Sequence, residues 1–151
     1  MDVLTPEQRR LNMSRIRGRD TKPELRIRCG LHRRGLRFRL HRKDLPGKPD
    51  LVFPRYRAVI FVHGCFWHGH GCHLSKAPAT RPEFWETKIS GNIARDRRVV
   101  ANLIEGGWRV LIIWECALRG ASKLTEEEVL APAASFVREP AQTFLELHGH
   151  R

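Results

Sequence analysis

The sequence predicts a mixed α/β fold in which a central sheet is flanked by helices. Two short apolar runs, AVIFV (58–62) and VLIIW (110–114), are typical of strands buried on both faces. A long segment with apolar residues at helical spacing separates them, and shorter helical segments with capping residues lie nearer both ends of the chain. With 151 residues and 41% hydrophobic content, the chain is long enough to bury one core. We therefore expect a single folded domain.

Two helices are expected before the sheet. A threonine cap, an early proline and a closing glycine predict helices over 5–18 and over 21–34. The first helix is rich in arginine and has little apolar surface. We interpret 1–20 as a basic arm that orders on a partner, or alternatively as a frayed terminus.

Three strands follow these helices. The segment 36–41 alternates apolar and basic residues, as a half-exposed strand does. The turn residues of PGKPD (46–50) separate it from strands expected over 51–53 and 57–64.

The second half of the chain predicts a helix over 82–107, a buried strand over 108–116 and a short capped helix over 125–137. A strand, a long helix and another strand in succession favour a crossover connection with parallel pairing. The predicted order is therefore α-α-β-β-β-α-β-α, with no internal repeat.

The charge of the chain points to an anionic partner. Lys and Arg number 28 against 16 Asp and Glu, a formal net charge of +12, and 15 of these basic residues fall within the first 50. Nucleic acid is the usual partner of such a surface. The alternatives are a solvated basic face and an anionic membrane surface. No apolar run is long enough to span a bilayer and no signal peptide is visible, so we expect a cytoplasmic protein, in which four cysteines suit a metal better than disulfides.

The segment HGCFWHGHGCHL (63–74) is the most unusual stretch of the chain. Zinc prefers thiolate and imidazole ligands in a tetrahedral arrangement, and three glycines allow the backbone to turn several side chains toward one point. The candidates within this segment are Cys65, His68, His70, Cys72 and His73, and Cys116 is a candidate distant ligand. The alternative is a loop of exposed histidines with reduced cysteines. Cys29, on the second predicted helix, is expected to be a small core residue.

A candidate catalytic centre lies just before this segment. Asp50 opens a strand beside a basic surface, where a carboxylate is suited to hold Mg²⁺ against phosphate, although an aspartate after proline is also a common turn residue. The next strand offers the backbone carbonyl of Val62 as another oxygen ligand. An imidazole ordinarily titrates near neutral pH, so His63 and His68 are candidate bases. Glu24 is a candidate partner for them, or a capping-box glutamate.

Aromatic residues interrupt the polar loop. Phe66 and Trp67 do not fall on a periodic apolar face, and Trp85 lies near the start of the long helix. Aromatic side chains beside basic residues can enter a base stack, and the alternative is that they cover the metal site or complete the core. Trp108 and Trp114 are assigned to the core.

These features together resemble the very-short-patch repair (Vsr) endonucleases. The resemblance rests on PGKPDLVF (46–53), HGCFWH (63–68) and WEC (114–116), in a match that extends from residue 13 to residue 120. It implies a restriction-endonuclease-like catalytic domain over 21–151. It also implies an Mg²⁺-dependent enzyme that nicks DNA 5′ to the thymine of a T·G mismatch produced by deamination of 5-methylcytosine.

The resemblance also implies a role for individual residues. Mg²⁺ is held by Asp50 and the main-chain oxygen of Val62, and His68 acts as the general base with support from His63 and Glu24. Structural zinc is held by Cys65, His70, Cys72 and Cys116. The residues expected to enter the duplex are Phe66, Trp67, Trp85 and, from the other groove, Met13, with Lys88 and Asn92 contacting the mismatch.

The expected partner is double-stranded DNA bound by a monomer, with mismatch-repair proteins as further candidates. Two alternatives remain: a zinc-stabilised DNA-binding protein without catalysis, and a restriction-type nuclease without mismatch specificity. The chain departs from the family pattern at Val62, where threonine is frequent, and at Gly69 and Gly71, where some members carry histidine.

Overall fold

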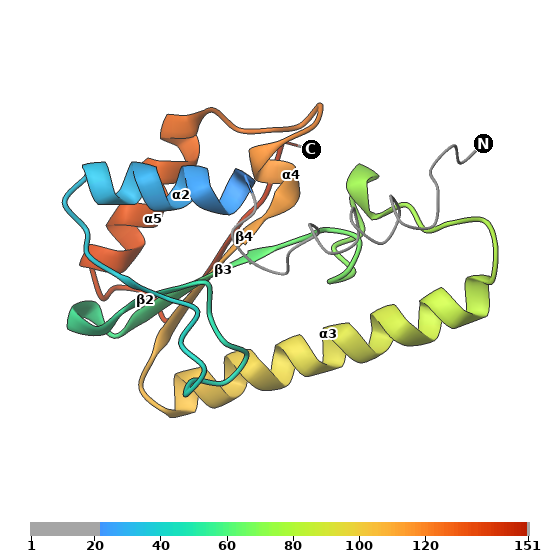
Figure 1. Ribbon diagram of the computed structural model, residues 1–151, viewed down its shortest axis with the longest axis horizontal. Coiled ribbons are helices and arrows are strands. Elements are labelled where there is room, and N and C mark those ends of the chain that lie inside the picture. The colour runs from blue at the N-terminus through green and yellow to red at the C-terminus, as the bar shows by residue number, and fades with distance from the viewer. Residues whose placement is uncertain (1–21, 151) are drawn as a thin grey trace, which may run out of the picture.

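Five strands form one mixed sheet in the order β1-β2-β3-β4-β5, with helices on both faces (Figure 1). The computed structural model describes residues 22–150. β1, β2 and β3 are antiparallel neighbours, whereas β3, β4 and β5 run parallel. The predicted parallel pairing of the two apolar strands is confirmed. The strands are β1 (Arg39–Leu40), β2 (Leu51–Phe53), β3 (Ala58–His63), β4 (Arg109–Trp114) and β5 (Phe144–Leu147).

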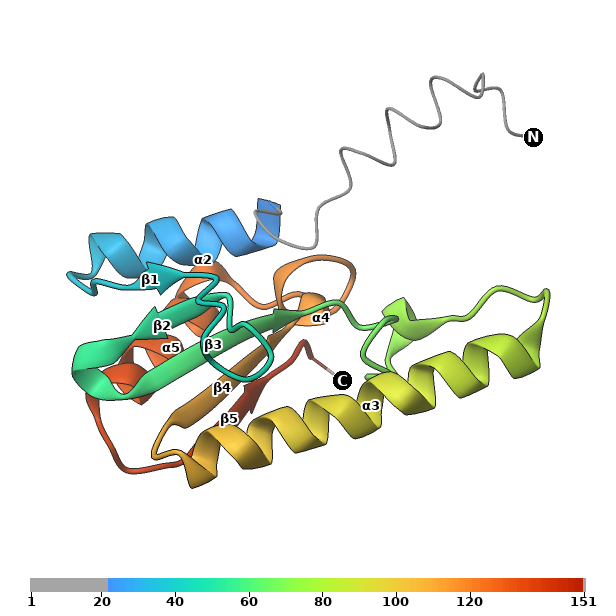
Figure 2. The same ribbon diagram turned by 60° about the horizontal axis from the view of Figure 1, so that its bottom comes forward.

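The helices form a layer on each side of the sheet (Figure 2). On one side lie α2 (Lys22–Arg33) and α5 (Glu126–Arg138), and on the other lies α3 (Pro82–Glu105), which makes the crossover from β3 to β4. The short helix α4 (Glu115–Leu118) continues directly from β4. The fold class predicted from the sequence, a mixed α/β sheet flanked by helices, is therefore correct.

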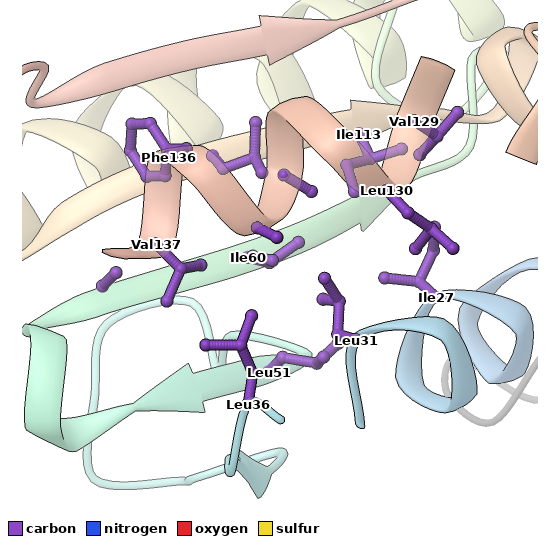
Figure 3. Close-up of a cluster of buried hydrophobic side chains, with 14 of the residues drawn as sticks. Ile27, Leu31, Leu36, Leu51, Ile60, Ile113, Val129, Leu130, Phe136 and Val137 are labelled. Atoms are coloured by element: carbon purple, nitrogen blue, oxygen red, sulfur yellow. The ribbon is translucent and has the colours of Figure 1, made fainter. Parts of the chain in front are cut away.

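Each face of the sheet has its own apolar cluster, because alternate residues of a strand point to opposite faces. On one face Leu51, Ile60 and Ile113 pack against Leu31 of α2 and Val137 of α5 (Figure 3). On the other face Val59, Phe61, Val110 and Ile112 pack with Leu103 of α3. Trp108 and Trp114 belong to this second cluster, as predicted.

The α3 face is the less completely covered of the two. Leu103 is the one residue of α3 that is fully buried, and the first half of the helix extends past the sheet and runs beside the loop after β3 (Figure 2). This arrangement leaves room between the loop, the sheet and α3.

The structure differs from the sequence prediction at the ends of several strands. The strand expected over 36–41 is limited to Arg39–Leu40, and the strand expected to reach residue 116 ends at Trp114, where α4 begins. The edge strand β5 was not predicted, because its four residues carry only a weak alternating pattern. The assignment of Cys29 to the core is wrong, because its side chain lies on the exposed side of α2.

Some predictions lie outside the described residues. These are the helix over 5–18, the basic arm 1–20, the Thr21 cap and Met13. Within residues 22–150, no helix is both long and apolar enough to cross a bilayer.

Candidate active site and metal cluster

The loop that follows β3 holds most of the residues singled out in the sequence. It begins after His63 and turns back at Gly69, where φ is +63°. A Cβ atom at this position would lie only 2.4 Å from Cδ1 of Ile93 on α3, so the absence of a side chain lets the loop lie directly against that helix. The side chains of the loop are thereby held between the sheet and α3.

A cleft of about 830 Å³ opens beside this loop. It lies between the turn before β2, the end of β3 and the middle of α3. The lining of the cleft includes His41, Asp50, Val62, His63, Trp67, His68, Asn92 and Asp96. Residues predicted to act in catalysis therefore share this cavity with His41 and Asp96, which the sequence analysis did not single out.

Two carboxylates and an imidazole meet at the base of the cleft. Asp50 immediately precedes β2, and its Oδ2 accepts a hydrogen bond of 2.7 Å from the backbone N–H of Val62. Glu24, in the first turn of α2, is 2% exposed, and its Oε1 lies 3.2 Å from Nε2 of His41. The other ring nitrogen of His41, Nδ1, lies 3.7 Å from Oδ1 of Asp50. One ligand atom from each of the three residues lies within 4.8 Å of the other two, so this cluster suits a divalent cation.

The electrostatics of Asp50 also fit a cation. Burial, together with the nearby charge of Glu24, raises the pKa of the Asp50 carboxyl to about 7, against the lowering effect of the Val62 hydrogen bond. A cation stabilises the ionised form of a carboxyl that is buried beside a like charge. Arg28 lies 3.5 Å from Oε2 of Glu24 and offsets part of the negative charge of the pair.

A second group, formed by His63, His68 and Asp96, lines the same cleft. The rings of His63 and His68 stack with their centroids 3.8 Å apart and their planes 2° apart. Burial lowers the pKa of His63 to about 3, with a smaller contribution from His68, so His63 is neutral at neutral pH. Nδ1 of His68 lies 2.6 Å from Oδ2 of Asp96 on α3. This contact fixes the ring of His68 and leaves its Nε2 for another partner.

Asp96 is a candidate functional residue that sequence reasoning missed. It lies within ARDRR (94–98) on helix α3. In the sequence, an acidic residue among arginines is usually interpreted as one member of a surface ion pair. Its relation to His68, 28 positions away, depends on how the loop folds back over α3.

Phe66, Trp67 and Trp85 form an aromatic cluster beside the cleft. Their ring centroids lie 5.0 to 6.0 Å apart in edge-to-face arrangements, and Trp67 is 49% exposed. None of the three belongs to either apolar core. The amide of Asn92 donates a hydrogen bond of 2.8 Å to the backbone oxygen of Trp67, while Lys88 is exposed on the same helix. The aromatic cluster is thus held by α3 and open on its outer side.

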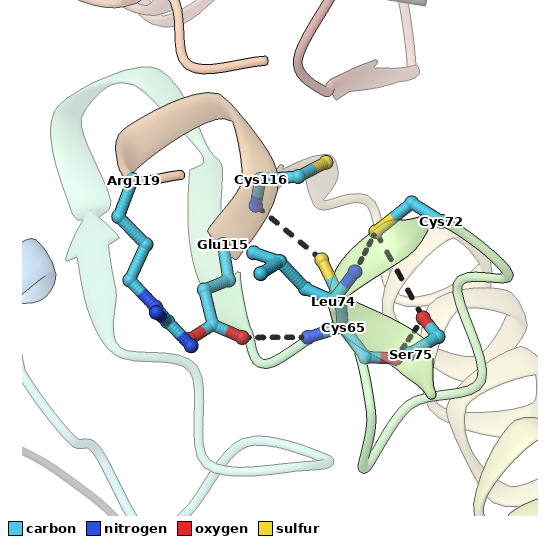
Figure 4. A network of polar contacts seen from close by, with 7 residues as sticks. All are labelled: Cys65, Cys72, Leu74, Ser75, Glu115, Cys116 and Arg119. Carbon is cyan, nitrogen blue, oxygen red and sulfur yellow. Dashed lines mark hydrogen bonds and ion pairs between the residues drawn. The ribbon is translucent and has the colours of Figure 1, made fainter. Parts of the chain in front are cut away.

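The thiols of Cys65, Cys72 and Cys116 (Figure 4) and the imidazole of His70 form a separate cluster. The ligand atoms of Cys65, His70, Cys72 and Cys116 all lie within 4.8 Å of one another. The backbone N–H of Cys116 donates to Sγ of Cys65 at 3.3 Å, and that of Leu74 donates to Sγ of Cys72 at 3.4 Å. A set of Cys₃His ligands is one that binds Zn²⁺ tetrahedrally.

The structure shows which of the candidate histidines lies with the thiols. His70 joins the thiols, with its Nδ1 3.6 Å from Sγ of Cys116, whereas His68 is engaged by Asp96. His73 is exposed and does not belong to the cluster. Burial raises the pKa of the Cys65 thiol well above its usual value, a shift that a bound cation reverses.

The C-terminal segment contacts this cluster at Cys116. β5 pairs with β4 up to Leu147, and Gly149 then lies beside the thiol of Cys116. The backbone N–H of Gly149 donates to Sγ of Cys116 at 3.3 Å, and the N–H of His150 donates to the oxygen of Ser122 at 2.7 Å. A Cβ atom on the buried Gly149 would lie 2.4 Å from the oxygen of Cys116. No local pattern in the sequence indicates this contact, because it depends on the unpredicted strand β5.

Comparisons with known proteins identify the family. The model of the family described as DNA mismatch endonuclease Vsr matches residues 1–74. The DNA mismatch endonuclease Vsr of Escherichia coli K12 is 56% identical to this chain over 126 residues, which cover 83% of this chain and 81% of that protein. The chain belongs to the Vsr family. It is therefore a DNA endonuclease, and DNA is its substrate.

Other Vsr relatives are named for nicking. The type II nicking enzyme V.XorIIP of Xanthomonas oryzae is 51% identical over 134 residues, covering 87% of this chain and 98% of that protein. The type II nicking enzyme V.NmeAIP of Neisseria meningitidis is 39% identical over 118 residues, covering 78% and 84% respectively. A nuclease of the Vsr family implies a divalent metal, and both the carboxylate cluster and the thiol cluster have ligand sets compatible with one.

Proposed function

We propose that this Vsr-family endonuclease is an Mg²⁺-dependent enzyme that nicks one DNA strand 5′ to the thymine of a T·G mismatch left by deamination of 5-methylcytosine. The observation that carries the proposal is the cleft, because one cavity combines a carboxylate site for a cation, a histidine held by an aspartate, and an adjacent exposed aromatic cluster. The names of two relatives, a mismatch endonuclease and a nicking enzyme, support a single-strand cut at a mispair.

Asp50 and the main-chain oxygen of Val62 would hold the Mg²⁺. In an extended strand, the N–H and C=O of one residue face the same neighbour. Because the N–H of Val62 donates to Asp50, its carbonyl faces the same side of β3. When bound, Mg²⁺ supplies Lewis-acid stabilisation of charge on the phosphate and lowers the pKa of water. The contribution of Val62 comes from its backbone, so valine is acceptable where relatives carry threonine.

His68 is the proposed general base. Asp96 holds Nδ1 of His68, so that Nε2 can accept the proton of the water that attacks phosphorus. His63 stacks on this ring and is neutral, so it can donate a hydrogen bond to a phosphate oxygen without competing for the proton. Glu24, which lies in the same cluster as Asp50, would orient a water molecule beside it.

The aromatic cluster is the proposed wedge. Phe66, Trp67 and Trp85 are exposed or half-exposed beside the cleft, so they can enter a base stack without dismantling the core. Inserting a side chain costs a few kcal/mol per unstacked step, and least at a weakly stacked mispair such as T·G. Selectivity for the mismatch then comes from the ease with which the T·G step deforms, as well as from contacts that Lys88 and Asn92 make with the bases. The contact of Asn92 with the backbone of Trp67 would couple reading of the mismatch to the position of the wedge.

The thiol cluster is the proposed structural zinc site, with Cys65, His70, Cys72 and Cys116 as ligands. All four have their ligand atoms within 4.8 Å, and the cluster joins the loop after β3 to the start of α4. Zinc held there would fix the loop that carries both the wedge and His68.

Several further features are proposed from the resemblance to the Vsr family. These are a restriction-endonuclease-like fold over 21–151, action as a monomer in the cytoplasm, and cooperation with mismatch-repair proteins. The mixed sheet, with Asp50 placed before β2, supports the fold assignment. The basic arm 1–20 is proposed to contact DNA phosphates, with Met13 entering the duplex, on the grounds of its charge.

The test is a cleavage assay on duplexes that differ in one base pair. Zinc-loaded protein with Mg²⁺ is incubated with duplexes containing T·G, T·A or C·G at one position, each strand carrying a different label. We expect a cut in the thymine strand of the T·G duplex alone, and none with EDTA or with Asp50→Asn. Equal cutting of the matched duplexes would favour the restriction-type nuclease. Binding without cutting in every methylation-site context would favour a DNA-binding protein.

A further inference from the structure

His41 lies in the catalytic cleft but has no role in the function proposed above. Its side chain is 13% exposed, and its two ring nitrogens face the two buried carboxylates of the ion site. Nε2 lies 3.2 Å from Oε1 of Glu24, and Nδ1 lies 3.7 Å from Oδ1 of Asp50. No other imidazole within residues 22–150 forms a metal-competent cluster with Asp50.

The backbone holds His41 in this position. The residue directly follows β1 and has φ of +48°, in the left-handed region that side-chain-bearing residues adopt uncommonly. Its N–H donates a hydrogen bond of 3.2 Å to the carbonyl oxygen of Asp50. The backbone therefore leaves the strand conformation at His41, directly opposite Asp50. Residues in such uncommon backbone conformations are concentrated at functional sites.

The charges of the site favour a cation near His41. Glu24 and Asp50 are both acidic, and Arg28 offsets one of them, lying 3.5 Å from Glu24 and 3.3 Å from Nε2 of His41. Two carboxylates and an imidazole are therefore brought within ligand distance of one another in a largely buried setting. Such a cluster offers a divalent ion carboxylate oxygens and, in His41, a nitrogen donor.

We propose that His41 is a nitrogen ligand of the ion held at Asp50, which makes the site a mixed nitrogen and oxygen site that accepts a first-row transition metal such as Mn²⁺ as well as Mg²⁺. The proposal rests on the proposed function in one respect, the placement of an ion at Asp50. Imidazole adds little to the binding of Mg²⁺, which prefers oxygen ligands, but it adds affinity for first-row transition metals. His41 would thereby raise the affinity of the site for Mn²⁺ relative to Mg²⁺.

A purely positioning role makes a different prediction. If His41 only orients Glu24 and Asp50, its replacement weakens Mn²⁺ and Mg²⁺ binding by the same factor. If it is a ligand, its replacement weakens Mn²⁺ binding by roughly tenfold or more and leaves Mg²⁺ binding nearly unchanged. The ratio of the two affinities therefore separates the two roles.

The experiment uses full-length protein with one equivalent of zinc, titrated with Mn²⁺ and followed by electron paramagnetic resonance, with Mg²⁺ affinity measured by competition. Pulsed measurements on bound Mn²⁺ detect ¹⁴N coupling from a nitrogen ligand. We expect this coupling in the wild type and in His68→Gln, and its loss in His41→Gln together with the selective drop in Mn²⁺ affinity. Histidine labelled with ¹⁵N changes the coupling in the wild type, which identifies an imidazole without relying on any substitution.

The outcomes distinguish this inference from the function on which it rests. Bound Mn²⁺ without nitrogen coupling, coupling that survives in a folded His41→Gln variant, or an equal loss of affinity for both ions would each overturn the role of His41 and leave the nicking mechanism standing. Mn²⁺ binding and nicking that both survive in Asp50→Asn would instead remove the ion site itself, and with it the mechanism and the inference.

Discussion

The thiol cluster and the catalytic cleft share one loop but differ in their ligands. The thiol cluster has three sulfurs and one nitrogen, accepts backbone N–H···S bonds, and is contacted at Cys116 by the C-terminal segment. The cleft has carboxylates and imidazoles around a cavity of about 830 Å³. Three thiolates and an imidazole suit an ion that stabilises structure, whereas carboxylate oxygens suit an ion that meets a substrate.

Residues of one short segment serve both regions. His63 and His68 line the cleft, while Cys65 and His70 belong to the thiol cluster. Two histidines separated by a single glycine therefore have different partners. The lesson is that a Cys- and His-rich segment is not one metal site by virtue of its composition, because neighbouring side chains of the loop point to different sites.

The largest expected effect is on the cleft alone. Asp50→Asn should lower the rate of nicking on the order of a thousandfold, because it removes the anchoring carboxylate of the ion site. DNA binding and the melting temperature should be retained, since the amide keeps the hydrogen bond with the N–H of Val62. Single-turnover cleavage and a binding titration on the same T·G duplex measure both. Normal nicking by this variant would show that the cleft is not the catalytic centre.

The next effect should fall on the thiol cluster alone. Cys65→Ser should destabilise the protein by about 4 kcal/mol, the range expected when a structural metal is lost. Cys29→Ser is the matched control, because Cys29 is exposed on α2 and should leave stability unchanged. Thermal denaturation with zinc analysis measures the difference. A Cys65→Ser variant that melts normally after losing its metal would remove the structural role of the cluster.

Asp96→Asn should give an intermediate effect. The variant keeps the size of the side chain at His68 but removes the charge that stabilises a protonated imidazole, so nicking should slow roughly tenfold to a hundredfold. Affinity for the T·G duplex and zinc content should be unchanged. The single-turnover rate of nicking and the affinity for the T·G duplex are measured for the variant and the wild type. A loss of zinc in this variant would mean that the two regions are not separate.

The contact of the C-terminal segment with Cys116 should give a smaller effect. Gly149→Ala places a methyl group 2.4 Å from the oxygen of Cys116 and 2.5 Å from that of Ser122, so the segment must move. Zinc release to a chromogenic chelator should accelerate several-fold. Gly91→Ala, where a Cβ meets nothing within 4 Å, is the matched control and should release zinc at the wild-type rate. Equal rates in all three proteins would exclude a role for the segment in retaining zinc.

The smallest effect should come from a site outside both regions. Thr125 and Glu128 form a capping box at the start of α5, and the Thr125 hydrogen bonds hold the pKa of Glu128 below its usual value. Thr125→Ala should lower the melting temperature by a few °C, roughly the loss of one cap, without changing nicking or zinc content. A lowered acid pKa stabilises the fold above the unfolded pKa. Alanine keeps the backbone N–H that donates to the Glu128 carboxylate and loses only the side-chain part of this effect, so the difference from wild type should shrink only slightly as pH falls through the folded pKa. A change in nicking would show that general destabilisation is enough to impair the cleft.

Local patterns in the sequence were sufficient to predict most of the fold. The apolar runs of β3 and β4, the length of α3 and the capping box of α5 are properties of adjacent residues, and each has its counterpart in the structure. The boundary of β4 was misplaced because α4 begins without a capping side chain or a glycine. β5 was missed because its edge position imposes only partial burial.

The parts of the site that were missed all depend on contacts between distant segments. His41 reaches Asp50 through the pairing of β1 with β2, and Asp96 reaches His68 because the loop folds back on α3. Arg109 shows the same limit in the core, where its guanidinium donates to backbone oxygens of Tyr56, Phe136, Val137 and Glu139 although a strand pattern predicts an apolar residue there. The functional roles of the remaining site residues stay predictions, supported by their placement.

The separation of the two regions can be tested most directly by anomalous diffraction from crystals of the zinc-loaded protein soaked in Mn²⁺, recorded at the absorption edges of both metals. The account predicts a zinc peak among Cys65, His70, Cys72 and Cys116, and a manganese peak beside Asp50, Glu24 and His41. Among residues 22–150, His63, His68 and Asp96 form another set of ligands within reach of one another, and an ion held there would occupy the proposed base. That result would contradict the placement of the catalytic ion at Asp50, and a manganese peak among the thiols would contradict the separation of the two regions.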